Sequence, residues 1–270
     1  MVEKIYIPTF RRVDSQITFA SLPDKYKEKI ILVVQEHERP LHKHDVEYLI
    51  VGDNIGIART RKEIIYHAGK SRFCMYDDDV KFYRRNLKYF GQESDMDSSK
   101  RIMSVQDFDE MFDLFNSWMD DENIIQIGSR NANLPPSGHL YKDITDVYST
   151  HMINGTEVSK FVDEIDWTFV EVGEDSMMTL EFFLRGYKNR QTDLFCANAK
   201  WWQKGGCAEF RNAEFHNKEH EKLLKKYPAF VYVKCEVERK HIGKILDYKY
   251  RWKEAYNSFY NNSLSEFIGA

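Results

Sequence analysis

The sequence predicts an α/β protein with one domain, built on a mostly parallel central sheet that helices flank. Two observations lead to this fold class. Short apolar runs alternate with stretches of helical periodicity through the first half of the chain, which is the pattern of βαβ units. The chain has 270 residues, of which 42% are hydrophobic and 30% charged, so it can bury a substantial core.

Each element follows from its own local pattern. Apolar runs predict five strands, at residues 4–8, 30–35, 46–51, 73–76 and 124–127. Apolar side chains at helical spacing predict three helices, at residues 57–68, 104–119 and from Glu174 to just before Gly186. Turn-forming residues predict a loop over 131–142. The first part resembles a nucleotide-binding half of a Rossmann-like fold, although neither GxGxxG nor GxxxxGK[ST] occurs.

Composition and charge bear on the cellular location of the protein and on the kind of partner it binds. No signal-peptide pattern and no membrane-spanning apolar stretch is present, and the four cysteines form no CxxC pair. We therefore expect a cytoplasmic protein without a membrane partner. The net charge is −4, yet basic residues gather at 81–88 and 234–253. Such patches are compatible with a polyanionic partner, and each of them is also typical of a solvated face.

The most informative motif is Asp77-Asp78-Asp79, which closes the apolar run 73–76. Three adjacent carboxylates repel one another, so they need a counter-charge, and a hard divalent cation with oxygen ligands is the simplest one. In open α/β sheets the carboxyl ends of strands are also where ligands bind. A solvated acidic turn is the alternative interpretation of the motif when it is taken alone.

Several segments, taken in order, resemble one enzyme family. They are IPTFRR at 7–12, VVQE at 33–36, NIGIARTR at 54–61, MYDDDV at 75–80, GSRN at 128–131, GED at 173–175 and LRGY at 184–187. Their order and spacing look like a GT-A glycosyltransferase, a metal-dependent enzyme with a nucleotide-sugar donor. The residues within these segments resemble those of the phage and base-J-type glycosyltransferases associated with TET/JBP dioxygenases. The resemblance covers roughly residues 4–210.

This resemblance implies roles for the acidic residues. Asp77-x-Asp79 matches the DxD motif, in which Asp79 and Asp77 would bind Mn²⁺ or Mg²⁺, and Asp77 or Asp78 would reach the ribose or a metal-bound water. The acidic pair maps onto Glu174-Asp175, with Asp175 as the general base of an inverting enzyme. A helix start weakens a carboxylate as a base, so a retaining reaction stays open.

The resemblance also places the donor and the acceptor. The residues that would line the nucleotide-sugar site are Pro8, Thr9, Arg11, Glu36, Asn54 and Arg61. Acceptor contacts would come from Arg130, Trp201 and Trp202, although two tryptophans are as typical of a core. GT-A enzymes often recruit a later histidine to the metal, and the candidates are His216, His220 and His241, each of which also suits a surface position.

The implied function is transfer of a sugar from a UDP-sugar to the hydroxymethyl group of a modified pyrimidine, 5-hydroxymethylcytosine, in DNA, as expected of a bacteriophage enzyme in the host cytoplasm. The sugar is open between glucose and a pentose such as arabinose, and the oligomeric state is open. The catalytic domain would span residues 1–210, and a helical extension rich in aromatic and basic residues would span 211–270.

Three other functions compete with this one. A GT-A enzyme with a polysaccharide or protein acceptor would use the same donor site. A phosphotransferase of the haloacid-dehalogenase type would use Asp77 as nucleophile and Asp79 as acid, but that family places its nucleophile after the first strand. A non-catalytic module that holds a metal or nucleotide is the third alternative.

Overall fold

The four strands expected in the first third of the chain are parallel neighbours, in the order β3-β2-β1-β4. Their bounds are β1 Lys4–Pro8, β2 Ile30–Gln35, β3 Glu47–Val51 and β4 Arg72–Tyr76. The computed structural model describes residues 2–89, 99–121, 123–199, 206, 212–239 and 243–268. Apart from Lys4, Gln35 and Arg72 at their ends, strands β1, β2 and β4 are apolar, because helices cover both of their faces.

The second half of the sheet contains strands of both directions. Its bounds are β5 Val80–Arg85, β6 Lys100–Ile102, β7 Ile124–Asn131, β8 Tyr141–Asp143, β9 Thr150–Asn154 and β10 Lys188–Ala199. The order continues β4-β9-β7-β10-β5-β6, and β8 pairs with β10. Among the described strands of this sheet, only β5, β8 and β9 oppose β1. The carboxyl ends of the other seven therefore share one edge.

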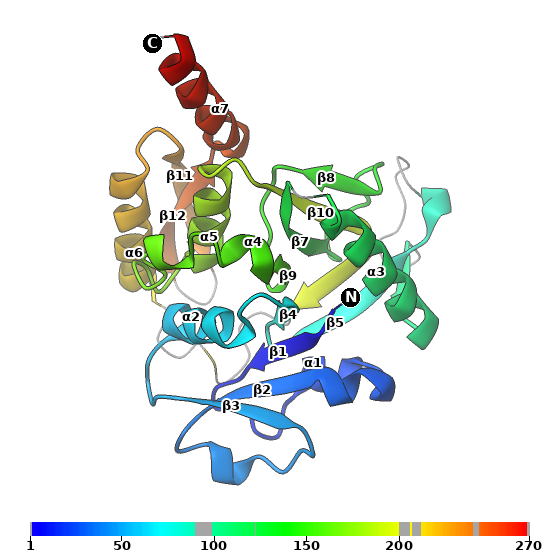
Figure 1. Ribbon diagram of the computed structural model, residues 1–270. Helices are drawn as coiled ribbons and strands as arrows, with labels where there is room; N and C mark the ends of the chain where they lie inside the picture. The colour runs from blue at the N-terminus through cyan, green and yellow to red at the C-terminus, as the bar shows by residue number, and fades with distance from the viewer. Residues whose placement is uncertain are drawn as a thin grey trace.

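Helices lie on both faces of this sheet (Figure 1). Their bounds are α1 Ile17–Ser21, α2 Ile57–Ala68, α3 Val105–Met119, α4 Gly155–Val158, α5 Glu174–Phe183, α6 Ala213–Lys226 and α7 Trp252–Ile268. Among the described residues, 3₁₀ turns lie at Asp24–Lys29, Arg39–Leu41, Leu87–Tyr89 and Val162–Glu164. The predicted class, an α/β domain with a large and mostly parallel sheet between helices, is confirmed.

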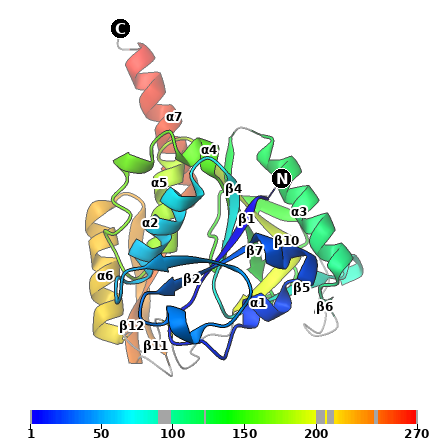
Figure 2. The same cartoon turned by 60° about the horizontal axis from the view of Figure 1, so that its bottom comes forward.

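The core is divided by the sheet into two layers. On one face, Phe108, Phe112 and Phe115 of α3 pack against Ile5 and Leu32. The other face is covered by α2, α4 and α5, which pack on the alternate residues of the same strands. Figure 2, turned by 60°, shows α3 apart from α2 and α5, on the opposite side of the sheet. Successive side chains of β1 and β2 point to opposite faces of the sheet, so each strand contributes to both layers of the core.

The predicted boundaries differ from the structure where polar residues are buried. Strand β7 runs on to Asn131, so Gly128, Ser129 and Arg130 lie inside it rather than after it. Strand β8 lies at the end of the expected loop 131–142. Strand β9 has no apolar run of ordinary length, and in β10 the buried polar residues Asn189, Thr192 and Asp193 precede the apolar residues 194–197.

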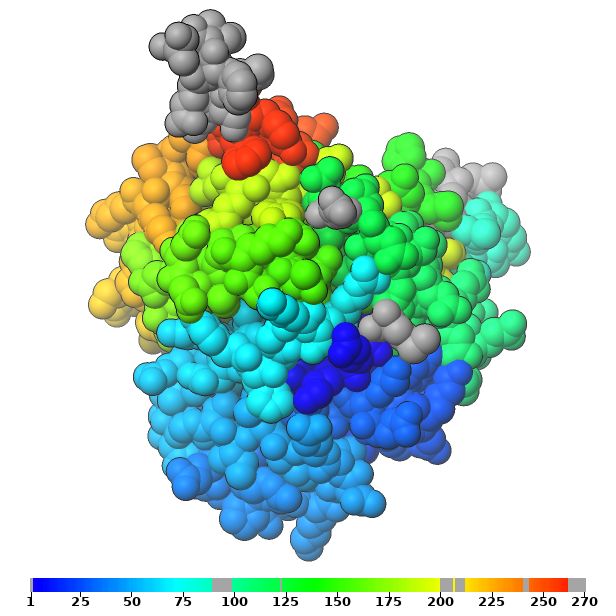
Figure 3. Space-filling model, viewed as in Figure 1, coloured from blue at the N-terminus to red at the C-terminus, as the bar shows by residue number. Residues whose placement is uncertain are grey.

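The C-terminal residues form a third apolar cluster around α5. A hairpin of β11 (Val231–Arg239) and β12 (Gly243–Tyr250) follows α6. Apolar side chains of α6, β12 and α7 pack on Met177, Leu180 and Phe183 of α5. Helix α7 projects from the rest of the molecule in Figure 1, and Figure 3 shows the α2, α4 and α5 regions as one continuous surface from cyan to yellow-green.

Candidate functional site

The triple aspartate forms a tight turn between β4 and β5. The Asp77 N–H donates to the Ser149 carbonyl at 2.9 Å, on the loop before β9. Thr18 of α1 holds the rest of the turn: its N–H donates to the Asp78 carbonyl at 3.0 Å, and its hydroxyl accepts from the Val80 N–H at 2.8 Å. The carboxylates are thus fixed at the sheet edge where the parallel strands end, as the sequence led us to expect.

Arg12 is the counter-charge of two of these carboxylates. It contacts Asp78 directly and lies 3.0 Å from Asp79. All three side chains are buried. Burial raises the pKa of Asp78 to about 7, and burial together with the charge of Asp77 raises the pKa of Asp79 to about 6, although Arg12 opposes both shifts. The turn therefore carries more negative charge than one guanidinium neutralises.

Arg61 joins this turn to the acidic pair at the start of α5. Its side chain extends from the first half of α2, where it is buried. One guanidinium nitrogen lies 3.1 Å from Asp77, and another lies 3.5 Å from Glu174 and contacts Asp175. Gly173, with a φ of 86°, lets the chain turn sharply into α5. The structure thus brings Arg61 and Asp77 together with both members of the acidic pair.

A buried histidine also contacts Asp175. His151, the second residue of β9, places its Nε2 atom 3.0 Å from Asp175 Oδ1. Its Nδ1 atom lies 3.0 Å from Nε2 of Gln126, on β7. Both side chains are fully buried. Burial, followed by the charge of Arg61, lowers the pKa of His151 well below its ordinary value, so the ring is neutral.

The donor set of the site suits a hard divalent cation. Five carboxylates (77, 78, 79, 174 and 175) and two guanidiniums (12 and 61) leave this cluster with a formal charge of −3. A diphosphate would add more negative charge. No group of three acidic, histidine or cysteine side chains converges on one point among the described residues. Mg²⁺ and similar ions ordinarily take one or two carboxylates plus substrate phosphates, so two aspartates would be enough.

The expected nucleotide side surrounds the ends of β1, β2 and β3. Pro8 and Thr9 are buried, and the Thr9 hydroxyl accepts from Gln16 at 2.8 Å. Arg11 and Glu36 are exposed at this edge. Asn54 is exposed as well, with a φ of 54°.

Two side chains that sequence reasoning missed hold this edge in place. Glu38 is buried and accepts from the Arg11 N–H at 2.7 Å, and Gln35 accepts from the Asn54 N–H at 2.9 Å. Arg11 has a φ of 55°, and the buried guanidinium at the triple aspartate belongs to Arg12, the next residue. The pair of adjacent arginines was the only signal in the sequence for this side chain.

The acceptor candidates are placed only in part. Arg130 lies near the end of β7, where it donates to the Pro135 carbonyl at 3.3 Å and lies 3.8 Å from Asp193. Trp201 and Trp202 lie outside the described residues. The described residue Gly206 donates to the Phe10 carbonyl at 2.9 Å and lies against the guanidinium of Arg12, the residue that pairs with Asp78 and Asp79.

The histidine candidates for a metal lie on α6, apart from His241, which is outside the described residues. The rings of His216 and His220 are 4.2 Å apart, and His220 also stacks on Tyr248 at 4.9 Å. His220 lies against Gly173, at the start of α5. Its contacts are thus with the acidic-pair side of the site.

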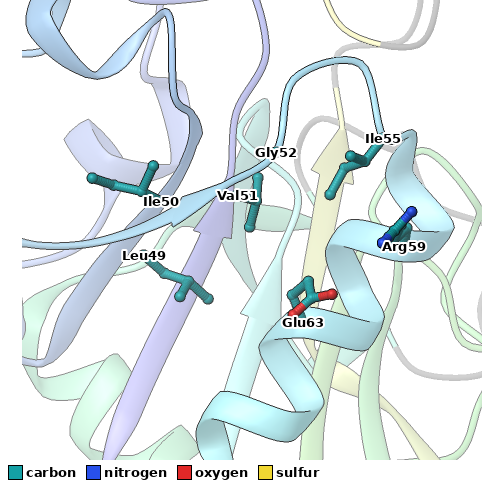
Figure 4. A pocket seen from close by; sticks show the side chains of 7 residues that line it. All are labelled: Leu49, Ile50, Val51, Gly52, Ile55, Arg59 and Glu63. Carbon is teal, nitrogen blue, oxygen red and sulfur yellow. The ribbon is translucent and has the colours of Figure 1, made fainter.

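A separate hollow lies between β3 and α2 (Figure 4). It has a volume of about 250 Å³, and its lining residues are Leu49, Ile50, Val51, Gly52, Ile55, Arg59 and Glu63. None of these belongs to the acidic cluster.

Among the described residues, no helix is both long and apolar enough to cross a membrane.

Comparison with known proteins gives one family. A family model described as TET-Associated Glycosyltransferase matches residues 3–193, a span that contains the triple aspartate, Arg61 and the acidic pair. No curated protein matches. Among the solved structures that match is the UTP-bound UGPase from Acinetobacter baumannii, with a TM-score of 0.41 and 10% identity over 73% of this chain and 88% of that one.

Proposed function

This chain belongs to the family of TET-associated glycosyltransferases and is an enzyme of that class, and from this premise we propose its reaction. It transfers a sugar from a UDP-sugar to the hydroxymethyl group of 5-hydroxymethylcytosine in DNA. The family supports the transferase chemistry directly, and its association with TET enzymes supports a modified pyrimidine as acceptor.

One observation carries the proposed reaction centre: Arg61 contacts Asp77 and Asp175 at once. Asp77 belongs to the turn that would meet the diphosphate of the donor, and Asp175 is the candidate base. Transfer needs both groups within one sugar's width of each other, because the bond to the leaving group breaks and the new bond forms at the same carbon. A single buried guanidinium that contacts both carboxylates meets this requirement.

A divalent metal, Mn²⁺ or Mg²⁺, would be held by Asp79 and Asp77, and it would stabilise the negative charge that develops on the diphosphate. Arg12 is paired with Asp78 and Asp79, and these ion pairs would restrain the turn as charge develops on the diphosphate. Asp175 takes the proton of the acceptor hydroxyl as its oxygen attacks the sugar carbon, which is the inverting course.

The donor and acceptor contacts extend this proposal outwards. Thr9, Arg11, Glu36 and Asn54 lie at the carboxyl edge beside the triple aspartate, where the nucleotide would lie. Arg130, at the end of β7, would face the acceptor. We propose that residues 1–210 form the catalytic domain and residues 211–270 the extension, and that the enzyme works in the cytoplasm.

The alternative acceptor, a polysaccharide or a protein, has one observation in its favour. Of the basic residues at 81–88, Arg84 pairs with Asp107 and Glu110, and Arg85 is buried against Asp193. Two lysines of the hairpin also pair with acids, Lys244 with Glu236 and Lys249 with Asp247. Fewer charges are therefore left for phosphate contacts than the sequence indicated.

The test is a product analysis. The protein is incubated with Mn²⁺, a panel of UDP-sugars and hydroxymethylated DNA, polysaccharide or peptide, and the DNA is digested to nucleosides that are weighed by mass spectrometry. We expect one sugar to be added to hydroxymethylcytosine, and we expect Asp79→Ala to lower the rate about 100-fold or more while the protein stays folded. Transfer to a sugar or peptide acceptor alone would establish the alternative. Full activity in Asp79→Ala would refute the proposed role of the motif.

A further inference from the structure

The buried chain of side chains behind Asp175 has a direction that its hydrogen bonds determine. It starts at the main chain of Thr145, whose N–H donates to Asn189 Oδ1 at 3.0 Å and whose carbonyl accepts from Asn189 Nδ2 at 2.6 Å. A main-chain N–H only donates and a carbonyl only accepts, so these two contacts establish which end of the Asn189 amide is oxygen.

The orientation of Asn189 determines that of Gln126. Asn189 Nδ2 also donates to Gln126 Oε1 at 3.2 Å, and the Thr179 hydroxyl donates to the same oxygen at 3.3 Å. The Gln126 oxygen therefore points at these donors, and its Nε2 points at His151. An amide nitrogen only donates, so Nδ1 of His151 must accept the hydrogen bond of 3.0 Å.

The orientation of Gln126 determines in turn which tautomer His151 adopts. A neutral imidazole carries one N–H, and a ring whose Nδ1 accepts must carry its proton on Nε2. Complete burial, together with the nearby charge of Arg61, keeps the ring neutral. The Nε2 atom lies 3.0 Å from Asp175 Oδ1. The N–H of the neutral ring is therefore on the nitrogen that lies beside the candidate base.

We propose that His151 is a positioning residue for Asp175, whose Oδ1 it holds through Nε2–H, with its tautomer imposed by Gln126 and Asn189. This inference rests on the proposed function, in which Asp175 is the base. Both Arg61 and His151 contact Oδ1, so Oδ2 is the oxygen that takes the proton of the acceptor. In that step the acceptor oxygen bonds to the sugar carbon, the bond from this carbon to phosphate breaks, and its electron pair leaves with the diphosphate.

A pair of substitutions separates this role from a merely structural one. His151→Asn keeps an oxygen that can accept from Gln126 but is too short to reach Asp175. His151→Gln is long enough to offer an amide N–H to Asp175. We expect His151→Asn to lower kcat by about 10- to 100-fold, because a misplaced reacting group costs up to about 100-fold. The KM for the UDP-sugar should stay within about twofold, and His151→Gln should recover at least fivefold of the lost kcat.

The matched control is His42→Asn. His42 is a buried histidine too, and it lies on the β2–β3 connection, where the charged groups that act on it are His44, Arg39 and Asp14, none of which belongs to the acidic cluster. We expect this variant to keep the wild-type kcat, which shows that loss of a buried imidazole does not by itself slow the reaction. Thermal unfolding of each variant establishes that the proteins compared are folded.

The tautomer is measured without any substrate. In protein labelled with ¹⁵N-histidine, two-dimensional NMR shows which ring nitrogen carries the proton, and His151→Asn identifies the signal by its loss. We expect the Nε2–H form for His151. A signal from the Nδ1–H form would overturn the inference, and so would wild-type kcat in folded His151→Asn.

The activities of Asp175→Asn and His151→Asn distinguish failure of the proposed function from failure of the positioning role alone. If Asp175→Asn transfers sugar as fast as the wild type, Asp175 is not the base and the proposed mechanism fails. If Asp175→Asn is inactive while His151→Asn is fully active, the base is right and only the positioning role of His151 is overturned.

Discussion

Asparagine in place of Asp78 should remove much of the pH dependence of unfolding in the metal-free protein. Asp78 is buried beside Asp79, and its pKa in the folded protein is raised from 3.8 to about 7. In the unfolded chain the carboxyl group loses its proton near its ordinary pKa, whereas in the folded protein it keeps the proton until about pH 7. The folded state therefore binds more protons between these values, and stability falls as pH rises.

The magnitude follows from the size of the shift. A difference of about three pKa units at 1.36 kcal/mol each gives about 4 kcal/mol, a large part of the stability of an ordinary domain. The contribution is fully present below pH 3.8 and is lost as pH rises through about 7. Asparagine has the shape of the protonated carboxyl and does not titrate, so Asp78→Asn should lack this loss.

Urea unfolding at several pH values, with a chelator present, measures the effect. The wild type should lose about 4 kcal/mol more than Asp78→Asn between about pH 4 and about pH 8. Asp45→Asn, at an exposed position, is the control and should follow the wild type. Parallel curves for the wild type and Asp78→Asn would refute the reasoning, because they would mean that Arg12 compensates the Asp78 charge completely.

Two further substitutions test the site and the fold. Arg61→Lys should lower kcat about 100-fold without unfolding the protein, because a single ammonium cannot span Asp77 and Asp175 as the planar guanidinium does, and wild-type steady-state rates would contradict this. Gly155→Ala should destabilise the protein by about 2–3 kcal/mol in urea unfolding, because the new Cβ would lie 2.3 Å from two main-chain carbonyl oxygens. Gly69→Ala, where the Cβ meets open space and only the φ of 58° is unfavourable, should cost about 1 kcal/mol, and equal losses would contradict the steric argument.

The sequence predicted those parts of the fold in which burial and polarity agree. Residues 30–35 and 57–68 form the predicted strand and helix with no change of bounds, because their apolar side chains face the core. It also predicted that the triple aspartate would follow a strand of the sheet. Strand β9 could not be found this way, since His151 and Asn154 are buried although they are polar. Prediction from hydrophobic periodicity assigns such polar residues to the surface.

The site shows the same limit at the level of single side chains. Adjacent residues such as Arg11 and Arg12 look equivalent in a sequence, but Arg11 is exposed and Arg12 is buried with the aspartates. Glu36 and Glu38 differ likewise, because only Glu38 is buried at the main chain of Arg11. The roles of these residues remain predictions. Which of two neighbours faces inwards depends on backbone angles that local composition does not encode.

The support of α5 has a consequence for how members of this family should be compared. The family match ends at residue 193, yet Phe183 and its neighbours on α5 pack against Tyr227, Tyr248 and Tyr256, which all lie beyond that point. Helix α5, which presents Asp175, is thus supported by packing against a part of the chain that the family model does not cover. Relatives whose C-terminal regions align poorly would need other residues to pack against the equivalent of α5. A shortened enzyme that ended at residue 193 would lose this support of α5, and with it the residues Phe195–Ala199 through which β10 pairs with β5.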